Sequence, residues 1–349
     1  MTPSTKCVLV TGASGFVGAN LTRRLCDDGH DVTAAVRPGA DLWRLEAPGS
    51  DSARLTVQPL DVADDAAVAR VVERLRPQWT FHLAAHGAYH WQTDTRRIFS
   101  TNLLGTVSLV EACRACGCEA FVNAGSSSEY GYKDHAPDED EALAPSSPYA
   151  VAKAAASLYC RREASDSPMR ACSLRLYTVY GPLEDPRRLL PRLLVHGLRG
   201  ELPPLVSPEV AHDFVAVEEV VDAFLLAARE APQGAVYNVG SGRQTTLREM
   251  VQIVCGALEL ELEPQWGSAP QRRCDTTTWL ADPGRIGREL GWRSQMPLED
   301  GVARMAHWLR ASVTLWPVYG LAESKGASQA AGTGEQAPAS QARSSGLGR

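Results

Sequence analysis

The sequence has no apolar run long enough to cross a membrane, and its N-terminus lacks the basic and apolar regions of a signal peptide. It also lacks any Lys- or Arg-rich run, and its formal net charge is −6. Composition therefore gives no support for a nucleic-acid or membrane-surface partner. From these absences we expect a cytoplasmic protein.

The sequence also lacks the even, regularly spaced cysteines of a disulfide framework, since its nine cysteines are scattered through 349 residues. Such usage fits reduced thiols better than a disulfide framework. Cys113, Cys116 and Cys118 form the one cluster, and no second cysteine or histidine pair has zinc-site spacing relative to them. We expect no metal site there.

Strand-like and helical patterns alternate through the first half of the chain. Apolar strands are expected at 7–10, 31–36, 55–57, 80–83, 120–124 and 171–176, with helices at 16–26, 64–75, 98–116 and 148–162. Regular alternation of apolar strands and helices predicts a parallel sheet that is covered on both faces. The predicted fold class is α/β, a Rossmann-type doubly wound parallel sheet with a smaller C-terminal α/β substrate lobe.

The pattern changes after residue 176, where segments rich in proline and charge appear. We expect residues 1–176 and 213–239 to form the dinucleotide-binding domain. Residues 177–212 and 240–318 are expected to form the substrate-binding lobe over the carboxyl ends of the strands. The tail from 319 to 349 has almost no large apolar residues and is predicted to be disordered.

A glycine-rich turn, Thr11-Gly12-Ala13-Ser14-Gly15-Phe16-Val17-Gly18, follows the first predicted strand. Gly12 permits a tight turn, Gly15 lets backbone amides approach a ligand, and Gly18 lets the helix pack close to the strand. The free N–H groups of the first helical turn then face a pyrophosphate. Glycines in this pattern also occur in ordinary turns, so the interpretation of the motif as a dinucleotide-binding loop depends on the rest of the chain.

Tyr149 and Lys153 lie one helical turn apart at the start of a predicted helix. A nearby ammonium lowers the pKa of a tyrosine, which can then exchange a proton with an alcohol or a carbonyl. Ser126, Ser127 and Ser128 follow the fifth predicted strand, at the edge of the sheet where such a site would form. A hydroxyl there can hydrogen-bond the substrate oxygen on which Tyr149 acts.

In this order, the motifs resemble the extended short-chain dehydrogenase/reductase family, the epimerases, dehydratases and reductases that act on nucleotide sugars. The resemblance runs from Val8 to about Leu309. Besides the motifs above, it rests on Leu60-Asp61-Val62, Phe81-His82-Leu83-Ala84-Ala85, Thr101-Asn102-Leu103-Leu104-Gly105-Thr106, Leu174-Arg175-Leu176, Val179-Tyr180-Gly181-Pro182, Asp213-Phe214-Val215 and Tyr237-Asn238-Val239-Gly240-Ser241-Gly242.

The resemblance implies that Tyr149 is the acid/base, and that Lys153 holds the nicotinamide ribose and lowers the pKa of Tyr149. Ser126 matches the family's catalytic Ser/Thr, and Ser127 is the alternative if the loop is shifted by one residue. Asn102 would brace the sheet and the site. The other residues expected at the cofactor are Gly12, Ser14, Gly15, Phe16, Val17, Gly18, Asp61, Val62, Leu83, Ala84, Ala85, Tyr177 and Val179.

The chain departs from the family pattern at His212, where many members carry an Arg that contacts the diphosphate of the substrate. A histidine is neutral about as often as not near neutral pH, whereas an arginine is always charged. Either the substrate is not a nucleotide sugar, or other cations bind the diphosphate. The candidates are Arg187, Arg188, Arg272 and Arg273.

The serine segment departs from the pattern of the dehydratases, which place an Asp-Glu pair directly after the catalytic Thr. Ser127 and Ser128 occupy those positions, and Glu129 could supply a carboxylate only by a shift of register. The resemblance therefore argues against 4,6-dehydration. Ser128 is expected to contact the substrate.

The second predicted strand ends at Arg37, and no acid occupies the strand end, although Asp41 is near. An acid at this position binds the ribose 2′-hydroxyl of NAD, whereas an arginine accommodates the phosphate of NADP. The sequence therefore favours NADP(H) over NAD(H).

Together these features lead us to expect hydride transfer at C4 of a nucleotide-diphosphate hexose, most simply reduction of a 4-keto-6-deoxyhexose. Alternatives are a 4-epimerase with tightly bound NAD, a reductase of a non-nucleotide ketone and, in a different class, a non-catalytic dinucleotide-binding sensor. The long helices at 98–116 and 148–162 could pair across a homodimer as a four-helix interface, as in similar enzymes.

Overall fold

The computed structural model describes residues 5–48, 52–271 and 275–321. Its centre is a seven-stranded parallel sheet with the strand order β3-β2-β1-β4-β5-β6-β9. The strands are β1 (Cys7–Thr11), β2 (Asp31–Val36), β3 (Leu55–Pro59), β4 (Trp79–His82), β5 (Ala120–Ser126), β6 (Arg170–Leu176) and β9 (Val236–Val239). The order reverses between β1 and β4, and open parallel sheets bind ligands at the carboxyl ends of such strands. The predicted Rossmann-type fold is confirmed.

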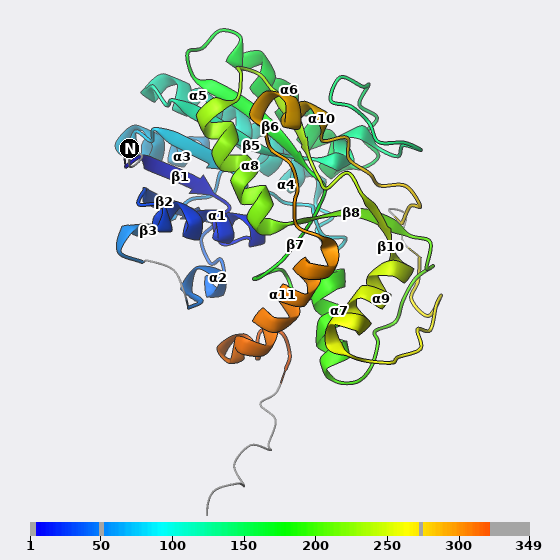
Figure 1. Cartoon of the computed structure of the whole chain (residues 1–349). Coiled ribbons are helices and arrows are strands. Elements are labelled where there is room, and N and C mark those ends of the chain that lie inside the picture. Colours follow the sequence, from blue (N-terminus) through cyan, green and yellow to red (C-terminus); the bar gives the residue numbers. More distant parts are fainter. Residues whose placement is uncertain (1–4, 49–51, 272–274, 322–349) are drawn as a thin grey trace, which may run out of the picture.

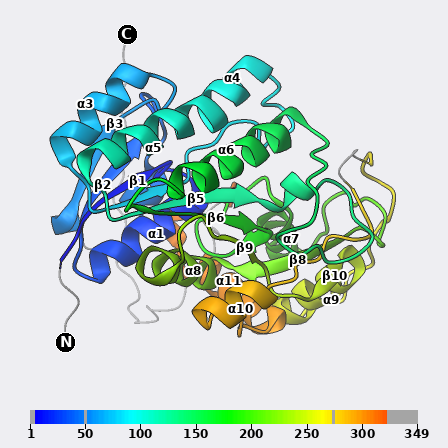
Figure 2. The same ribbon diagram turned by 90° about the horizontal axis from the view of Figure 1, so that it is seen from above.

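Helices cover both faces of this sheet (Figures 1 and 2). The helices on one face are α3 (Asp65–Leu75), α5 (Gly105–Cys116) and α6 (Pro148–Ala164), and those on the other are α1 (Phe16–Asp27), α8 (Val217–Glu230) and α10 (Gly284–Leu290). Alternate residues of a strand point to opposite faces, so Val8 and Val10 pack in one core and Leu9 in the other. Burial on both faces explains why these strands are apolar throughout.

The helix predicted at 98–116 belongs to a longer helical segment. This segment begins with α4 (Thr95–Phe99), passes through a π-helical turn at Ser100–Leu104 and continues as α5. π-helical turns often mark functional sites, and this turn carries Asn102.

A second, three-stranded sheet is built from β7 (Thr178–Tyr180), β8 (Ala211–Ala216) and β10 (Gln244–Thr246). Its helices, α7 (Leu189–Leu198), α9 (Leu247–Leu258) and α11 (Leu298–Ala311), pack in a separate core. The sequence predicts that residues 213–239 all form part of the dinucleotide-binding domain. Instead β8 pairs with β7 and β10, whereas α8 and β9 pack with the large sheet.

The ordered chain extends past residue 318, where the disordered tail was predicted to begin. Tyr319 is buried, and its hydroxyl donates to the Glu184 carbonyl oxygen at 2.8 Å. The ring also packs edge-on against Trp43 of the short helix α2 (Trp43–Glu46). The prediction was therefore wrong for Tyr319, and residues 322–349 lie outside the described residues. None of the described helices is long and apolar enough to cross a membrane.

Candidate active site

The glycine-rich loop is held tightly against the end of β4. Gly12 has a φ of +68°, and a Cβ there would lie 2.6 Å from the Ala84 nitrogen and from the Leu83 carbonyl carbon. A Cβ on Gly18 would collide with the Gly12 carbonyl oxygen. Both positions therefore require glycine.

Helix α1 begins directly after this loop, and its N-cap, Gly15, makes no side-chain capping hydrogen bond. The first N–H groups of the helix thus remain available for an anion, as dinucleotide binding requires. Phe16 and Val17 form the first helical turn, and the Ser14 carbonyl oxygen accepts a hydrogen bond from Arg44 at 3.3 Å. This cradle of available N–H groups, in a loop that leaves no room for a Cβ at Gly12 or Gly18, fits a dinucleotide pyrophosphate.

Asn102 holds the loop that follows β4. Its Oδ1 accepts from the His86 backbone nitrogen at 2.9 Å, and its Nδ2 donates to the His86 carbonyl oxygen at 2.6 Å. The loop is thereby fixed just beyond Ala84 and Ala85, the residues expected to line the nicotinamide path. The structure thus shows Asn102 bracing the loop that follows β4.

His82 ties the neighbouring elements together beneath the site. Its Nδ1 lies 2.7 Å from the Thr11 hydroxyl and its Nε2 lies 2.9 Å from the Thr106 hydroxyl. Burial lowers the pKa of His82 to about 3, with a smaller contribution from Lys153. The imidazole is therefore neutral and serves the structure of the sheet.

Tyr149 and Lys153 project from the start of α6 toward the end of β5. The Lys153 Nζ donates to the Ala124 carbonyl oxygen at 2.9 Å and lies 6.0 Å from the centroid of the Tyr149 ring. Burial lowers the pKa of Lys153 to about 8, while the nearby Glu129 opposes that shift.

The pKa of Tyr149 differs from the sequence expectation. Burial raises it to about 12, and the side-chain hydrogen bond with Ser126 opposes the rise. Lys153 does not contribute, because its ammonium is turned to the Ala124 carbonyl oxygen. The expected lowering of the pKa of Tyr149 by Lys153 is therefore wrong for the protein without ligands.

The two candidate serines face different partners. Ser126 lies close enough to Tyr149 to lower its pKa, and the Ser126 Oγ lies 2.8 Å from the Ser128 Oγ. Ser127 is buried, and its Oγ accepts from the Trp279 Nε1 at 3.1 Å. The geometry thus favours Ser126 as the hydroxyl that acts with Tyr149, and Ser128 lies beside it.

Glu129 is fully buried and fully engaged. It pairs with Arg175 at 2.9 Å, and it accepts hydrogen bonds from the Ser126 nitrogen at 2.9 Å and the Ser157 hydroxyl at 3.0 Å. Burial raises the pKa of Glu129, and Arg175 opposes the rise. Glu129 therefore orders the serine loop and does not face the site as a dehydration acid.

Arg37 and Asp61 lie near each other where β2 and β3 end. Partial burial raises the pKa of Asp61, but the Arg97 ion pair at 2.6 Å, with the charge of Arg37, lowers it overall. Arg37 is exposed. The neighbouring Val62 packs so tightly that a Cβ on Gly105 would lie 2.7 Å from its carbonyl oxygen.

His212 lies on β8 among aromatic rings. Its Nδ1 is 3.3 Å from the Thr178 hydroxyl, and its ring packs edge-on against Phe214 and Trp279. Burial lowers the pKa of His212 to about 4, although Asp275 opposes this shift. The ring is therefore neutral at pH 7 and cannot supply the charge of the arginine it replaces.

Tyr177 and Val179 border the site between the two sheets. The Tyr177 nitrogen donates to the Val239 carbonyl oxygen at 3.0 Å, and its ring packs against Trp279. Arg187 is exposed and forms an ion pair with Asp185. The predicted substrate residue Arg272 and its neighbour Arg273 lie outside the described residues.

Sequence reasoning missed three aromatic residues at the site. Trp279 comes from the loop before α10, whereas Tyr89 and Trp91 come from the loop after β4, where their rings stack 4.6 Å apart. No motif marks them, because each one reaches the site only through contacts between segments far apart in the sequence.

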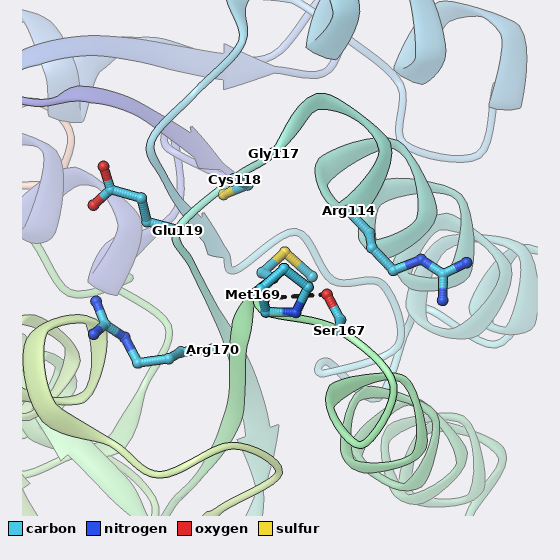
Figure 3. A pocket seen from close by; sticks show the side chains of 8 residues that line it. Arg114, Gly117, Cys118, Glu119, Ser167, Met169 and Arg170 are labelled. Carbon is cyan, nitrogen blue, oxygen red and sulfur yellow. Dashed lines mark hydrogen bonds between the residues drawn. The ribbon is translucent and has the colours of Figure 1, made fainter.

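A pocket of about 350 Å³ lies at the opposite edge of the sheet, where β5 and β6 begin (Figure 3). Figure 3 shows Glu119 and Arg170 on one side of it and Arg114 on the other. None of the predicted site residues lines it.

Comparison with known proteins agrees with this geometry. The model of the NAD dependent epimerase/dehydratase family matches residues 8–240. A UDP-glucose 4-epimerase from Mycolicibacterium smegmatis is 31% identical over 86% of this chain and 98% of its own length. A dTDP-glucose 4,6-dehydratase from Neisseria gonorrhoeae is 29% identical over 88% and 96%. The structure of MoeE5 in complex with UDP-glucose and NAD superposes with a TM-score of 0.76 and 33% identity, covering 87% of this chain and 99% of MoeE5.

Proposed function

The chain belongs to the NAD dependent epimerase/dehydratase family, a family of extended short-chain dehydrogenases/reductases, and from this premise we propose that it reduces a keto group at C4 of a nucleotide-diphosphate 6-deoxyhexose. The observation that carries this proposal is the position of Ser126 beside Tyr149, whose pKa it lowers, together with the glycine-rich cradle. A nicotinamide cofactor bound in that cradle supplies the hydride.

The proton comes from this chain's own residues. Because the pKa of Tyr149 is about 12, its hydroxyl is protonated at neutral pH and can donate to the oxygen of the substrate. Ser126 positions that oxygen by a second hydrogen bond. Lys153, whose Nζ lies 6.0 Å from the centroid of the Tyr149 ring, would hold the nicotinamide ribose, as the family resemblance implies.

Two features support reduction over dehydration and epimerisation. Ser127 and Ser128 stand where the dehydratases carry acids, and Glu129 is engaged with Arg175. Arg37 at the end of β2 supports NADP(H), which a reductase exchanges in each turnover. MoeE5 and the Thermus thermophilus UDP-glucose 4-epimerase were solved with NAD, so a 4-epimerase that retains NAD is the alternative.

The reaction is tested by mixing the protein with NADPH and a nucleotide-linked 4-keto-6-deoxyhexose. We expect net loss of NADPH absorbance together with one new hydroxyl in the product. An epimerase would instead carry tightly bound NAD through purification and consume no NADPH. A protein inert toward every keto sugar, but able to bind the dinucleotide, would match a sensor.

The NADP(H) preference is tested with Arg37→Ala. Loss of one charged contact to the 2′-phosphate should weaken NADPH binding about tenfold and leave NADH binding unchanged. Arg54→Ala is the matched control, because Arg54 is exposed and pairs with Asp31 at the other end of β2. An unchanged NADPH/NADH affinity ratio in Arg37→Ala would overturn the preference.

The proposal extends to a homodimer through α5 and α6. Three large apolar side chains are exposed on this side: Leu104 (55%), Val151 (39%) and Leu158 (55%). Val151 and Leu158 are seven residues apart and share a face of α6. Light scattering should show a dimer at micromolar concentration, and Leu158→Glu should dissociate it. A monomeric wild type would contradict this part.

A further inference from the structure

Two segments meet beside Tyr149. The loop after β4 passes so close that a Cβ on Gly87 would lie 3.5 Å from the Tyr149 Cβ. From that loop, the Tyr89 hydroxyl donates to Asp185 Oδ2 at 3.0 Å, which joins it to the segment before α7. The side chains at this junction therefore border the catalytic tyrosine.

Arg187, on one side of the junction, has its charge neutralised. Its Nε donates to Asp185 Oδ1 at 2.8 Å and its Nη2 to Asp185 Oδ2 at 2.6 Å. The guanidinium also lies 4.3 Å from the centroid of the Trp91 ring. Arg187 thus fixes Asp185 and the aromatic pair, and it offers little charge to a substrate.

Arg188 differs from its neighbour. Its guanidinium lies 4.7 Å from the centroid of the Tyr89 ring, and within residues 5–48, 52–271 and 275–321 it forms no ion pair. Its positive charge lowers the pKa of both Tyr149 and His212, so both lie within its field.

Two acids lie near Arg188, and neither neutralises it. Asp185 is already paired with Arg187 and bonded to Tyr89. Glu184 is buried, which raises its pKa to about 8 although Arg188 opposes the rise, so it is mostly uncharged at pH 7. Arg188 is therefore exposed and is not neutralised by either acid.

We propose that Arg188 binds the diphosphate of the substrate, supplying the charge that neutral His212 lacks. A guanidinium presents forked N–H groups that match phosphate oxygens, and the ring of Tyr89 supports it from one side. This inference rests on the proposed function, because it assumes a nucleotide-linked sugar.

Calorimetric titration of UDP, dTDP, CDP and GDP into the full chain tests it. Arg188→Ala should weaken the best-bound nucleoside diphosphate by about 10- to 100-fold, because a charge-assisted pair is lost. The nucleoside diphosphate affinity of Arg188→Lys should lie between those of wild type and Arg188→Ala, since lysine keeps the positive charge but lacks the forked N–H groups of arginine. NADPH affinity should stay unchanged in both variants.

Arg162→Ala, which removes an exposed arginine paired with Asp166, is the control and should change nucleoside diphosphate affinity by less than about threefold. Equal binding by Arg188→Ala and wild type would overturn the role of Arg188 alone. An equal loss of NADPH and diphosphate binding in Arg188→Ala would show a structural role and overturn it as well. A wild type that binds none of the four diphosphates would overturn both this role and the nucleotide-sugar part of the proposed function.

Discussion

The proposed cofactor side and the proposed substrate side of the site are built in different ways. On the cofactor side the backbone makes the site: Gly12 and Gly18 leave no room for a side chain, and Asn102 clamps the next loop. On the substrate side long side chains make it, with Arg187 and Arg188 packed on aromatic rings. The cofactor side is thus fixed before a ligand arrives, whereas the substrate side can change by single substitutions.

This difference teaches where specificity lies. Glycines permit one loop geometry and so suit a ligand shared by a whole family. Arginines and tryptophans on loops tolerate replacement, so they suit the part of the ligand that varies. The substitutions below separate the two sides, from the largest expected effect to the smallest.

Tyr149→Phe tests the point where the two sides meet. Turnover should fall by about 100- to 10,000-fold, because the proton donor is lost while the ring still packs. Cofactor affinity, measured by fluorescence titration, should stay unchanged. Tyr159→Phe removes a surface hydroxyl bonded to Glu111 and should leave turnover intact. Equal activity of the two variants would contradict the assigned role of Tyr149.

Gly12→Ala tests the backbone origin of the cofactor side. The new Cβ meets the Ala84 nitrogen and also strains a positive φ, so we expect a loss of several kcal/mol in stability and loss of NADPH binding. Gly29→Ala is the control, because it has a φ of +84° but open space around it. It should cost only about 1–2 kcal/mol from strain. An equal loss of stability in Gly12→Ala and Gly29→Ala would mean that the close packing around Gly12 does not determine the geometry of the loop.

His82 gives the cofactor side a pH dependence. The unfolded chain binds a proton to this histidine below about pH 6.5, whereas the folded protein does not until about pH 3. The free energy of unfolding should therefore fall as the pH falls between these values, by about 1.4 kcal/mol per pH unit. Urea titrations should show this slope reduced in His82→Gln. The same slope in both proteins would mean that the folded protein already protonates His82.

Trp279→Phe should produce the smallest effect, confined to the substrate side. It removes the indole N–H that bonds Ser127 at 3.1 Å and keeps an aromatic ring. We expect a few-fold rise in KM for the sugar, consistent with about 1 kcal/mol for one hydrogen bond. NADPH affinity should be unchanged, and a parallel loss of both affinities would weaken the separation of the two sides.

The two sides also differ in how far the sequence predicts them. The large sheet follows from apolar strands alternating with helices, and the glycine spacing predicts the cradle because each glycine answers a local steric need. Helix α3 begins with a similarly local feature, because the side chain of its N-cap, Asp64, accepts from the Ala67 nitrogen at 2.9 Å. Each of these features leaves a recognisable pattern within a short stretch of sequence, even where the contact it makes, such as that of Gly12 with Ala84, is distant.

The remaining features depend on contacts between distant segments. Strands β7 and β10 have three residues each and carry too little pattern to be recognised. The sequence leaves Ser127 as an alternative to Ser126, and the contact of Ser127 with Trp279, which is remote in the chain, helps to separate their roles. The direction of Lys153 toward Ala124 is also invisible before the fold is known.

The central claim is that this chain passes a hydride from NADPH to C4 of a sugar. A single turnover with NADPH deuterated at the transferable position, followed by mass spectrometry and NMR of the product, tests it directly. The account predicts one deuterium bound to C4 of the sugar and one equivalent of NADP⁺. A sugar without deuterium, or NADPH that keeps its label while the sugar is converted, would contradict it.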